Sequence, residues 1–491
     1  MEIELKFALL ADDPAALAQR LSALPLLSRR KARHTTLHNT YFDTPDQLLR
    51  ASRTALRVRQ RGTATAPQWV QTLKTGSADD SALSQRGEWE FPLASDRLDA
   101  ALLQSTPWRD LDPDGTLFAA LVPQVVIAFA RTTWTVGLRD GSRVEVALDI
   151  GTVEAGGITA PICELELELQ AGEPEALFDV AQRIAKSVSL IPLHWSKSEQ
   201  GYQLAQMRLH APLRACPVPL SKAMSLVEVA TATLREMFLQ FTANLNHLRV
   251  SEDPEVLHQA RIGWRRLKSA LQLFGKHPGL AAQPALAPLL PLVRAMAQQR
   301  DLDVAAVETL PMFAHVYTGG DAVRRTHWKA MEQALAHAVT AQRKEVLDAL
   351  AQPDVGACLI DIMRWLEVQL AEGQSVYPDL RAAHVADWVL RRLARLHEKL
   401  KNQPRRSSDA TVQHRIRILS KRLRYGVEAL QPLLPRRKAK RWLQEATALQ
   451  DNIGSARDIA SAVDLVQQLP VDARLVEFLR GVAFGERMHA G

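Results

Sequence analysis

The sequence has few cysteines, few aromatic residues and no long apolar run. Its three cysteines, Cys163, Cys216 and Cys358, lie far apart and lack metal-ligand spacing, so we expect neither a disulfide framework nor a zinc site. Rare cysteines fit a reducing compartment. No apolar segment is long enough to span a membrane, and no signal peptide precedes the first expected strand. We therefore expect a cytoplasmic protein without a membrane partner.

Charge is abundant but unevenly distributed along the 491 residues, whose formal net charge is +7. Residues 1–215 contain 23 Lys and Arg against 26 Asp and Glu, whereas residues 216–491 contain 38 against 28. The second half should therefore attract polyanions, which could be nucleic acid, anionic lipid or polyphosphate.

The opening residues alternate between charged and apolar side chains. In a strand, Glu2, Glu4 and Lys6 share one face, and apolar residues occupy the other. Two carboxylates beside an ammonium group suit a divalent cation bound together with an anion, because hard cations prefer oxygen ligands. The alternative for this segment alone is a polar face turned to water.

The same alternation recurs through the first half of the chain, in segments 54–61, 68–74, 86–90, 128–136, 143–149 and 163–169. So many strands with one charged face indicate a closed antiparallel β-barrel whose charged faces line a central passage. Helices at 14–27 and 175–188 would cover its apolar outer face. A charged lining is costly to desolvate unless water, metals and a charged ligand fill the passage.

The expected lining carries both signs of charge. Its acidic members are Glu2, Glu4, Asp149, Glu164 and Glu166; its cations are Arg57, Arg59, Lys74 and Arg131, with Lys6, Lys186 and Lys197 as further candidates. A matching ligand is a polyanion that carries a metal, such as Mg²⁺-triphosphate. Phosphoryl transfer uses this combination, since the metal bridges oxygens and fixed cations offset transition-state charge.

These residues resemble the CYTH domain, the triphosphate tunnel metalloenzyme fold, over roughly residues 1–205. The resemblance rests on the opening triad, the Arg57/Arg59 pair, Lys74, the Glu88/Glu90 strand, Asp149 and the Glu164/Glu166 pair. Segments 161–169 and 196–202 are especially similar to bacterial inorganic triphosphatases of this family.

The resemblance implies a function for each matching residue. Metal ligands, for Mg²⁺ or Mn²⁺, would be Glu2, Glu4, Glu164 and Glu166, helped by Asp149; triphosphate would contact Lys6, Arg57, Arg59, Lys74, Arg131 and Lys197. With Glu2 and Glu4, these six cations are the catalytic candidates. Glu168 is either a further ligand or the solvated end of its strand. Glu88 and Glu90 either serve the site or form ion pairs with neighbouring arginines.

The second half begins after a segment with three prolines in residues 212–219, which predicts an extended linker. Beyond it the apolar period becomes helical, and Ser225 with Glu228 predicts a capping box. We expect a multidomain α+β protein. It would have a barrel domain at 1–208, a linker at 209–221 and an all-α domain at 222–488, built as two repeated helical bundles at about 222–350 and 355–488.

An internal repeat supports this division. Histidines 258 and 414 are each followed by cations at positions +3, +7, +8 and +10 and by Leu at +9. In a helix, positions 0, +3, +7 and +10 fall within about 80°, so each helix presents one narrow basic stripe. The alternative is a solvated face opposite the apolar side of Trp264 and Leu267. Because the spacing is duplicated, we favour binding of a polyanion.

This half resembles the CHAD domain over about residues 222–485, through its duplicated histidine–arginine helices. That family is associated with inorganic polyphosphate. The resemblance implies contacts from His258, Arg261, Arg265, Lys268, His414, Arg417, Lys421 and Arg424. Arg266 and Arg422 point away from the stripe and are weaker candidates.

The leading hypothesis is a metal-dependent inorganic triphosphatase that releases pyrophosphate and phosphate, attached to a polyphosphate-binding helical domain. A thiamine triphosphatase or a CYTH-type adenylate cyclase would use the same tunnel. A different interpretation is a non-catalytic scaffold on polyphosphate or nucleic acid, although scarce aromatics (5%) disfavour nucleic acid. The intact acidic series favours catalysis.

Overall fold

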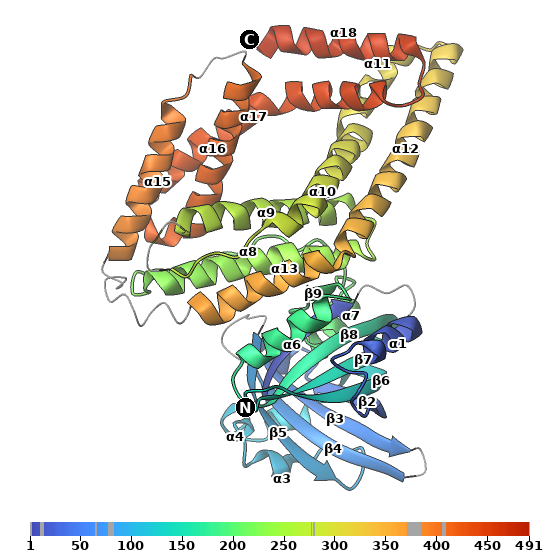
Figure 1. The fold of residues 1–491 in the computed structure, drawn as a ribbon, viewed down its shortest axis with the longest axis vertical. Coiled ribbons are helices and arrows are strands. Elements are labelled where there is room, and N and C mark those ends of the chain that lie inside the picture. Colours follow the sequence, from blue (N-terminus) through green and yellow to red (C-terminus); the bar gives the residue numbers. More distant parts are fainter. Residues whose placement is uncertain are drawn as a thin grey trace. The chain divides into compact units, whose positions relative to one another are not determined.

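The computed structural model describes residues 2–9, 14–63, 66–76, 83–275, 277, 280–370, 384–404 and 409–490 (Figure 1). The chain forms two compact units. The first comprises Met1–Pro212, Leu245–Ser251 and Ala351–Val368; the second comprises Leu213–Asn244, Glu252–Leu350 and Gln369–Gly491. Within the described ranges, every helix is too short or too polar to cross a bilayer.

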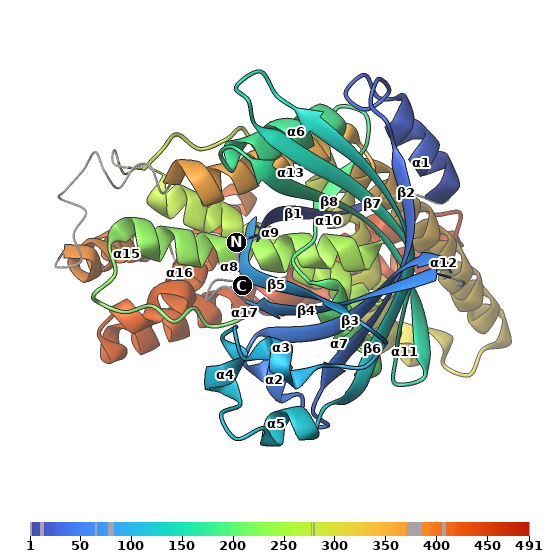
Figure 2. The same cartoon turned by 90° about the horizontal axis from the view of Figure 1, so that it is seen from below.

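The first unit is built on nine strands. They are β1 (Glu2–Leu9), β2 (Arg33–Asp43), β3 (Thr54–Thr63), β4 (Ala66–Thr75), β5 (Leu83–Leu93), β6 (Val122–Gly137), β7 (Arg143–Ala155), β8 (Ile158–Ala171) and β9 (Leu190–Pro192). Their order is β5-β4-β3-β2-β6-β7-β8-β1-β9, and β1 also pairs with β5. The first eight strands therefore close into the antiparallel barrel that the alternation predicted (Figure 2).

Strand pairing brings distant charged residues together on the inner face. Lys6 lies opposite Glu166 across β1 and β8, Asp149 lies opposite Glu164 across β7 and β8, and Glu2 lies opposite Arg86 across β1 and β5. Intervening residues such as Leu5 and Leu165 are fully buried on the outer face. The two-residue turn at Gly156 and Gly157 has positive φ at both positions, as tight hairpins require.

Helices cover parts of the outer face of the barrel. Those of the first unit are α1 (Pro14–Ala23), α2 (Leu48–Ala51), α3 (Ala100–Leu103), α4 (Trp108–Leu111), α5 (Thr116–Ala119), α6 (Glu175–Ala185) and α7 (Lys197–Ala205). Helix α6 buries Leu177, Phe178 and Val180, whereas Leu103 and Trp108 pack over Leu56 of β3. The two predicted covering helices are thus present, although α1 ends at Ala23 rather than at residue 27.

A helix from late in the sequence also belongs to the first unit. Helix α13 (Pro353–Arg364) packs against α6 and β9. Gln182 donates to the carbonyl of Ala357 at 2.9 Å, and Arg364 pairs with Asp179 at 2.9 Å. A Cβ placed on Gly356 would lie only 2.6 Å from the backbone nitrogen of Leu190.

Replacing Gly356 with Ala should therefore destabilise the first unit by about 1–3 kcal/mol, the usual cost of overpacking a well-packed contact. A Cβ placed on Gly481 of α18 would meet no heavy atom within 4 Å, so Gly481→Ala should instead stabilise the protein by about 0.5–1 kcal/mol. Chemical unfolding of the two variants measures both effects. Equal stability of the two would contradict this packing account.

Every regular element among the described residues of the second unit is a helix. With α13 set aside, the helices are α8 (Leu226–Leu248), α9 (Pro254–Phe274), α10 (Leu290–Asp303), α11 (Ala314–Thr318), α12 (Ala322–Leu350), α15 (Val385–Lys401), α16 (Ala410–Leu430), α17 (Arg436–Gln467) and α18 (Ala473–Ala490). Short 3₁₀ or π turns of this unit occur at Ala287–Leu289, Val304–Thr309, Leu310–Phe313 and Gln431–Leu433, and a further π turn at Trp365–Gln369 directly follows α13 of the first unit. The predicted capping box is confirmed, since Ser225 and Glu228 bond each other's backbone nitrogens.

Packing in the second unit combines helices from both halves of the sequence repeat. Helix α9 contacts α16, and Phe274 of α9 stacks on Trp388 of α15. Helices α10 and α12 contribute to one core with α17 and α18, which includes Met331, Val463 and Leu479. The histidine-bearing helices α9 and α16 are consequently neighbours.

Candidate active site

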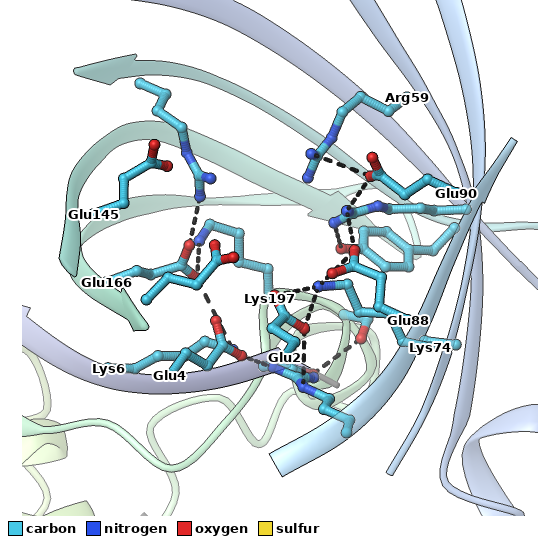
Figure 3. Close-up of a pocket in the computed structure, with 18 of the residues that line it drawn as sticks. Glu2, Glu4, Lys6, Arg59, Lys74, Glu88, Glu90, Glu145, Glu166 and Lys197 are labelled. Carbon is cyan, nitrogen blue, oxygen red and sulfur yellow. Dashed lines mark hydrogen bonds and ion pairs between the residues drawn. The ribbon is translucent and has the colours of Figure 1, made fainter. Parts of the chain in front are cut away.

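The inner face of the barrel encloses a charged cavity of about 260 Å³. Figure 3 shows acidic and basic side chains from several strands pointing toward one another within it. The lining residues are Glu2, Glu4, Lys6, Tyr41, Ala55, Arg57, Arg59, Arg61, Lys74, Arg86, Glu88, Glu90, Phe129, Arg131, Glu145, Glu166, Glu168, Gln170, Ser196, Lys197 and Ser198. Both signs of charge therefore meet in one small space, as the sequence predicted.

Three carboxylates cluster on β7 and β8 at one wall. Asp149, Glu164 and Glu166 each offer an oxygen within 4.8 Å of the others. Asp149 and Glu164 are only 0% and 1% exposed, so they lie beneath the cavity surface. Clustered carboxylate oxygens are the donors that Mg²⁺ and Mn²⁺ prefer, and the donor set fits a divalent cation.

Lys197 neutralises this cluster from the first turn of α7. Its Nζ lies 2.7 Å from Asp149 Oδ2 and 2.8 Å from Glu166 Oε1, and it also contacts Glu164. Arg131 adds two hydrogen bonds to Asp149, at 2.7 and 2.6 Å, and one to Glu166. Although burial raises the pKa of Glu166, Lys197 and Arg131 lower it well below its usual range. Burial together with the two neighbouring carboxylates raises the pKa of Glu164 despite Lys197.

Helix α7 holds Lys197 in this position. Ser196 caps the helix by accepting a hydrogen bond from the backbone nitrogen of Glu199 at 3.1 Å. Gly201 packs so closely on Val125 of β6 that a Cβ would lie 2.2 Å from a valine methyl carbon. The Tyr202 hydroxyl donates to Asp43 at 2.9 Å. This packing bounds the charged cavity on the side of α7.

Glu2 and Glu4 form a second acidic pair on β1. Lys74 donates to both oxygens of Glu2 at 2.8 Å, and Arg86 pairs with both glutamates. Lys6 lies 2.8 Å from Glu4 and 3.9 Å from Glu166, so it connects this pair to the first cluster. Burial raises the pKa of Glu2, but Lys74 and Arg86 lower it to about 2.

The cations of β3 occupy the opposite wall. Arg57 donates to the Tyr41 hydroxyl at 3.3 Å, and Arg59 donates to Asn39 at 2.8 Å. Burial and then the adjacent Arg57 and Arg131 lower the pKa of Arg59 to about 9. Crowded, buried cations of this kind are stabilised by a bound anion.

Glu88 and Glu90 of β5 form ion pairs with cations of β3 and β4. Glu88 lies 3.1 Å from Lys74 and 3.4 Å from Arg57, and Glu90 lies 3.4 Å from Arg61. Both glutamates thus form the ion pairs that one of the two alternatives expected. Both also line the cavity.

The basic stripes of the second unit also meet. Arg261 and Arg265 of α9 interact electrostatically with Arg417 and Lys421 of α16, and Arg300 of α10 lies near His258. Burial and then these arginines lower the pKa of Lys421 to about 7. Burial also lowers the pKa of His258 to about 4, with a smaller contribution from Arg300. The two helices therefore form one cationic surface.

The remaining stripe residues differ in exposure. Lys268 and His414 are exposed, and Arg424 pairs with Glu428 at 3.5 Å while lying over the Tyr425 ring. Trp264 and Leu267 are buried on the far side of α9.

Residues 1–202 match the family model of the CYTH domain, and residues 232–467 match that of the CHAD domain. The chain contains a CYTH domain followed by a CHAD domain. An inorganic triphosphatase of Haemophilus influenzae is 33% identical to the CYTH region over 205 residues, which are 41% of this chain and 54% of that protein. The chain thus aligns with about half the length of this curated relative.

Two solved structures are similar to the separate parts. The CHAD domain of the plant Ricinus communis is 28% identical, covers 57% of this chain and 92% of its own, and has a TM-score of 0.49. A putative adenylyl cyclase from Hippeastrum, described as having a dominant triphosphatase activity, is 23% identical, covers 41% of this chain and 96% of its own, and has a TM-score of 0.31.

The CYTH cavity contains charged residues that sequence reasoning did not assign to it. Arg86 is the most prominent, because it contacts both β1 glutamates, and Glu145 and Arg61 also line the cavity. Arg86 shares the alternating face of Glu88 and Glu90, so its inward direction was visible in the sequence. Its pairing with β1 was not.

The suggestion that Lys186 lines the cavity is wrong, and Arg266, a weaker candidate for polyphosphate binding, forms a buried ion pair instead. Lys186 is exposed at the C-terminus of α6 and is not part of the cavity lining. Arg266 is 5% exposed, and Glu236 pairs with it at 2.8 Å. Arg266 therefore stabilises the contact between α8 and α9.

Proposed function

We propose that the CYTH domain hydrolyses inorganic triphosphate to pyrophosphate and phosphate with Mg²⁺ or Mn²⁺. The observation that supports this proposal is the cluster of Asp149, Glu164 and Glu166 paired with cations at the wall of one cavity of about 260 Å³, into which Glu166 and Lys197 project. Glu2 and Glu4 add two further carboxylates to the cavity lining, and Lys6 lies near both Glu4 and Glu166. Their direct ligation of the metal remains a prediction.

In this proposal, Arg57, Arg59 and Lys74 bind the phosphate chain, and Arg131 and Lys197 offset charge near the acidic cluster. A bound divalent cation would polarise phosphoryl oxygens. Water adds in line at the terminal phosphorus, the bridging P–O bond breaks, and phosphate and pyrophosphate leave. Fixed cations accelerate this step because charge on the phosphoryl oxygens is neutralised without reorganisation.

The cavity favours an inorganic substrate over a nucleoside or thiamine ester. Its volume lies below the roughly 300–1,000 Å³ typical of pockets for drug-sized ligands. Among the described lining residues, Tyr41 and Phe129 are aromatic, and both face cations: Arg57 contacts Tyr41, and Lys197 lies 5.2 Å from the centre of the Phe129 ring. Little apolar surface is left for a base or a thiazole ring.

Phosphate release tests this proposal. Triphosphate, pyrophosphate, ATP and thiamine triphosphate are compared with Mg²⁺, with Mn²⁺ and with chelator. We expect metal-dependent turnover that is fastest for triphosphate. Faster turnover of ATP or thiamine triphosphate would support the alternative substrates, and no turnover of any would support a non-catalytic scaffold.

We further propose that the CHAD domain binds inorganic polyphosphate across α9 and α16. The supporting observation is the convergence of Arg261, Arg265, Arg417 and Lys421, whose mutual repulsion a polyanion would relieve. Polyphosphate and DNA binding are compared at several salt concentrations, because both are salt-sensitive. Equal affinity for the two would contradict a preference for polyphosphate.

This binding should weaken as pH rises above about 7. In the free protein Lys421, whose pKa is about 7, is charged below that pH and neutral above it. The neighbouring Arg261, Arg265, Arg417 and Arg424 disfavour its charged form. A bound polyanion favours the charged form, so the protein takes up a proton when it binds polyphosphate above pH 7. The affinity for polyphosphate should therefore fall by up to about tenfold for each pH unit above 7. Calorimetry in buffers of different ionisation enthalpy measures both the affinity and the proton uptake. The control Lys421→Arg should remove this dependence, and an unchanged dependence would refute the assignment.

A further inference from the structure

A second cationic cavity lies on a different side of α16 from the basic stripe. It has a volume of about 890 Å³ and is walled by the C-terminal part of α9, by α15 and by α16. Five cations line it, namely Arg391, Arg392, Arg395, Lys399 and Arg422, against one carboxylate, Glu398. We call this cavity the α15 cleft. Arg422 projects about 100° around α16 from Lys421, which separates the cleft from the stripe.

The sequence repeat shows what is unusual about the cleft. Arg422 follows His414 by eight positions, as Arg266 follows His258. In the first copy Arg266 is buried and neutralised by Glu236 of α8, at 2.8 Å, with a further hydrogen bond to Gln240. In the second copy the neighbouring helix contributes arginines instead of that carboxylate.

The cations of the cleft outnumber the one carboxylate among its described lining residues. Among the residues that the structure describes, no ion pair within 4.0 Å joins Arg391, Arg392, Arg395, Lys399 or Arg422 to a carboxylate. Arg391, Arg395 and Lys399 are spaced four residues apart on α15, and like charges at this spacing repel one another. An anionic ligand would remove this repulsion and would gain bidentate hydrogen bonds from guanidinium groups.

The cleft also has apolar walls, which the CYTH cavity largely lacks. Leu273 of α9 and Ala394 and Leu396 of α15 contribute to its lining. Its volume falls in the range of about 300–1,000 Å³ that suits organic ligands. Guanidinium groups bind phosphate at their edges and stack on aromatic rings with their faces.

We propose that the α15 cleft binds a nucleoside phosphate, with its phosphates on the arginines and its base against the apolar wall. This site is separate from the polyphosphate stripe and does not depend on the proposed triphosphatase activity. A long inorganic chain would satisfy the cations but not the apolar wall, so inorganic polyphosphate is the competing occupant that the test distinguishes.

The test titrates ATP into the full-length protein by calorimetry, in chelator and with saturating inorganic triphosphate to occupy the cationic sites that recognise a phosphate chain alone. We expect ATP binding to persist. The double variant Arg391→Glu/Arg395→Glu should weaken it by at least tenfold. The control Arg436→Glu/Arg437→Glu makes the same charge change at exposed positions of α17 and should leave it unchanged.

Photo-crosslinking with 8-azido-ATP locates the site independently. Labelled peptides should come from α9, α15 or α16, and labelling should be lost in the Arg391→Glu/Arg395→Glu variant. Complete displacement of ATP by triphosphate, labelling confined to other helices, or equal affinity of the cleft and control variants would each overturn the proposal.

Discussion

Replacing Glu166 with Gln is expected to lower the proposed metal-dependent hydrolysis of triphosphate by about 10²–10³-fold, the size of effect seen when one preorganised electrostatic contact is removed from an active site. Glu166 belongs to the three-carboxylate cluster and also accepts from Lys197 at 2.8 Å and from Arg131. Glutamine keeps the shape but loses the charge, so both metal affinity and the positions of these cations should suffer. Phosphate release measured over a metal titration separates the two effects.

Glu154→Gln is the matched control, because Glu154 lies exposed on β7, the strand that also carries Asp149, and away from the cavity lining. It should retain the parental rate. Thermal unfolding of both variants checks that the barrel is folded. A folded Glu166→Gln enzyme with a rate within about threefold of the parent would show that no important transition-state contact is lost.

The second large effect is expected for Lys197→Met measured in chelator. Lys197 is 7% exposed and contacts Asp149, Glu164 and Glu166. Its removal leaves two buried carboxylates and the half-buried Glu166 without their shared lysine, and breaking a buried ion pair typically costs about 3–5 kcal/mol. The free energy of unfolding should fall by about that amount.

Metal should then rescue the variant more than it stabilises the parent protein. In the parent, a cation binding to the cluster competes with the Lys197 ammonium; in Lys197→Met it does not, so Mn²⁺ should raise the unfolding free energy more. Lys186→Met is the control, because Lys186 is exposed at the end of α6, and it should change little in either condition. Equal stabilisation of all three proteins by Mn²⁺ would argue against a metal at this cluster.

The barrel was predictable because its strands alternate strictly. The alternation of Glu164, Leu165 and Glu166 indicates a strand with one charged and one apolar face. In the structure Leu165 is buried and Glu166 lines the barrel cavity. The capping box at Ser225 was predictable for a similar reason, since its two partners are three residues apart. Local periodicity therefore determined the elements and the direction of their side chains.

The contacts across the cavity were not predictable, because they depend on which strands become neighbours. Nothing near Glu2 indicates that Arg86 lies opposite it, since β1 and β5 meet only when the barrel closes. In the same way, Lys197 meets Asp149 because α7 packs on β6, β7 and β8, and the local sequence does not show which strands α7 contacts. The sequence shows which charged residues share the inner face, whereas the order of the strands determines which of them form ion pairs.

The repeated helices show the same division. The spacing of Arg261 and Arg265 from His258 predicted one basic stripe, but not that the stripe would face Lys421 of the second copy. The difference between Arg266 and Arg422 depends on the neighbouring helices, α8 and α15. Identical spacing in sequence therefore led to a buried ion pair in one copy and an open cationic cleft in the other.

The most direct test is a crystal structure of the protein with Mn²⁺ and a non-hydrolysable triphosphate analogue, using anomalous scattering to locate the metal. We expect Mn²⁺ on carboxylate oxygens of Glu164 and Glu166, with the analogue in the barrel cavity against Arg57, Arg59 and Lys74. Mn²⁺ and analogue bound outside the barrel, with Lys197 still among Asp149, Glu164 and Glu166, would contradict the proposal that this cavity is the catalytic site.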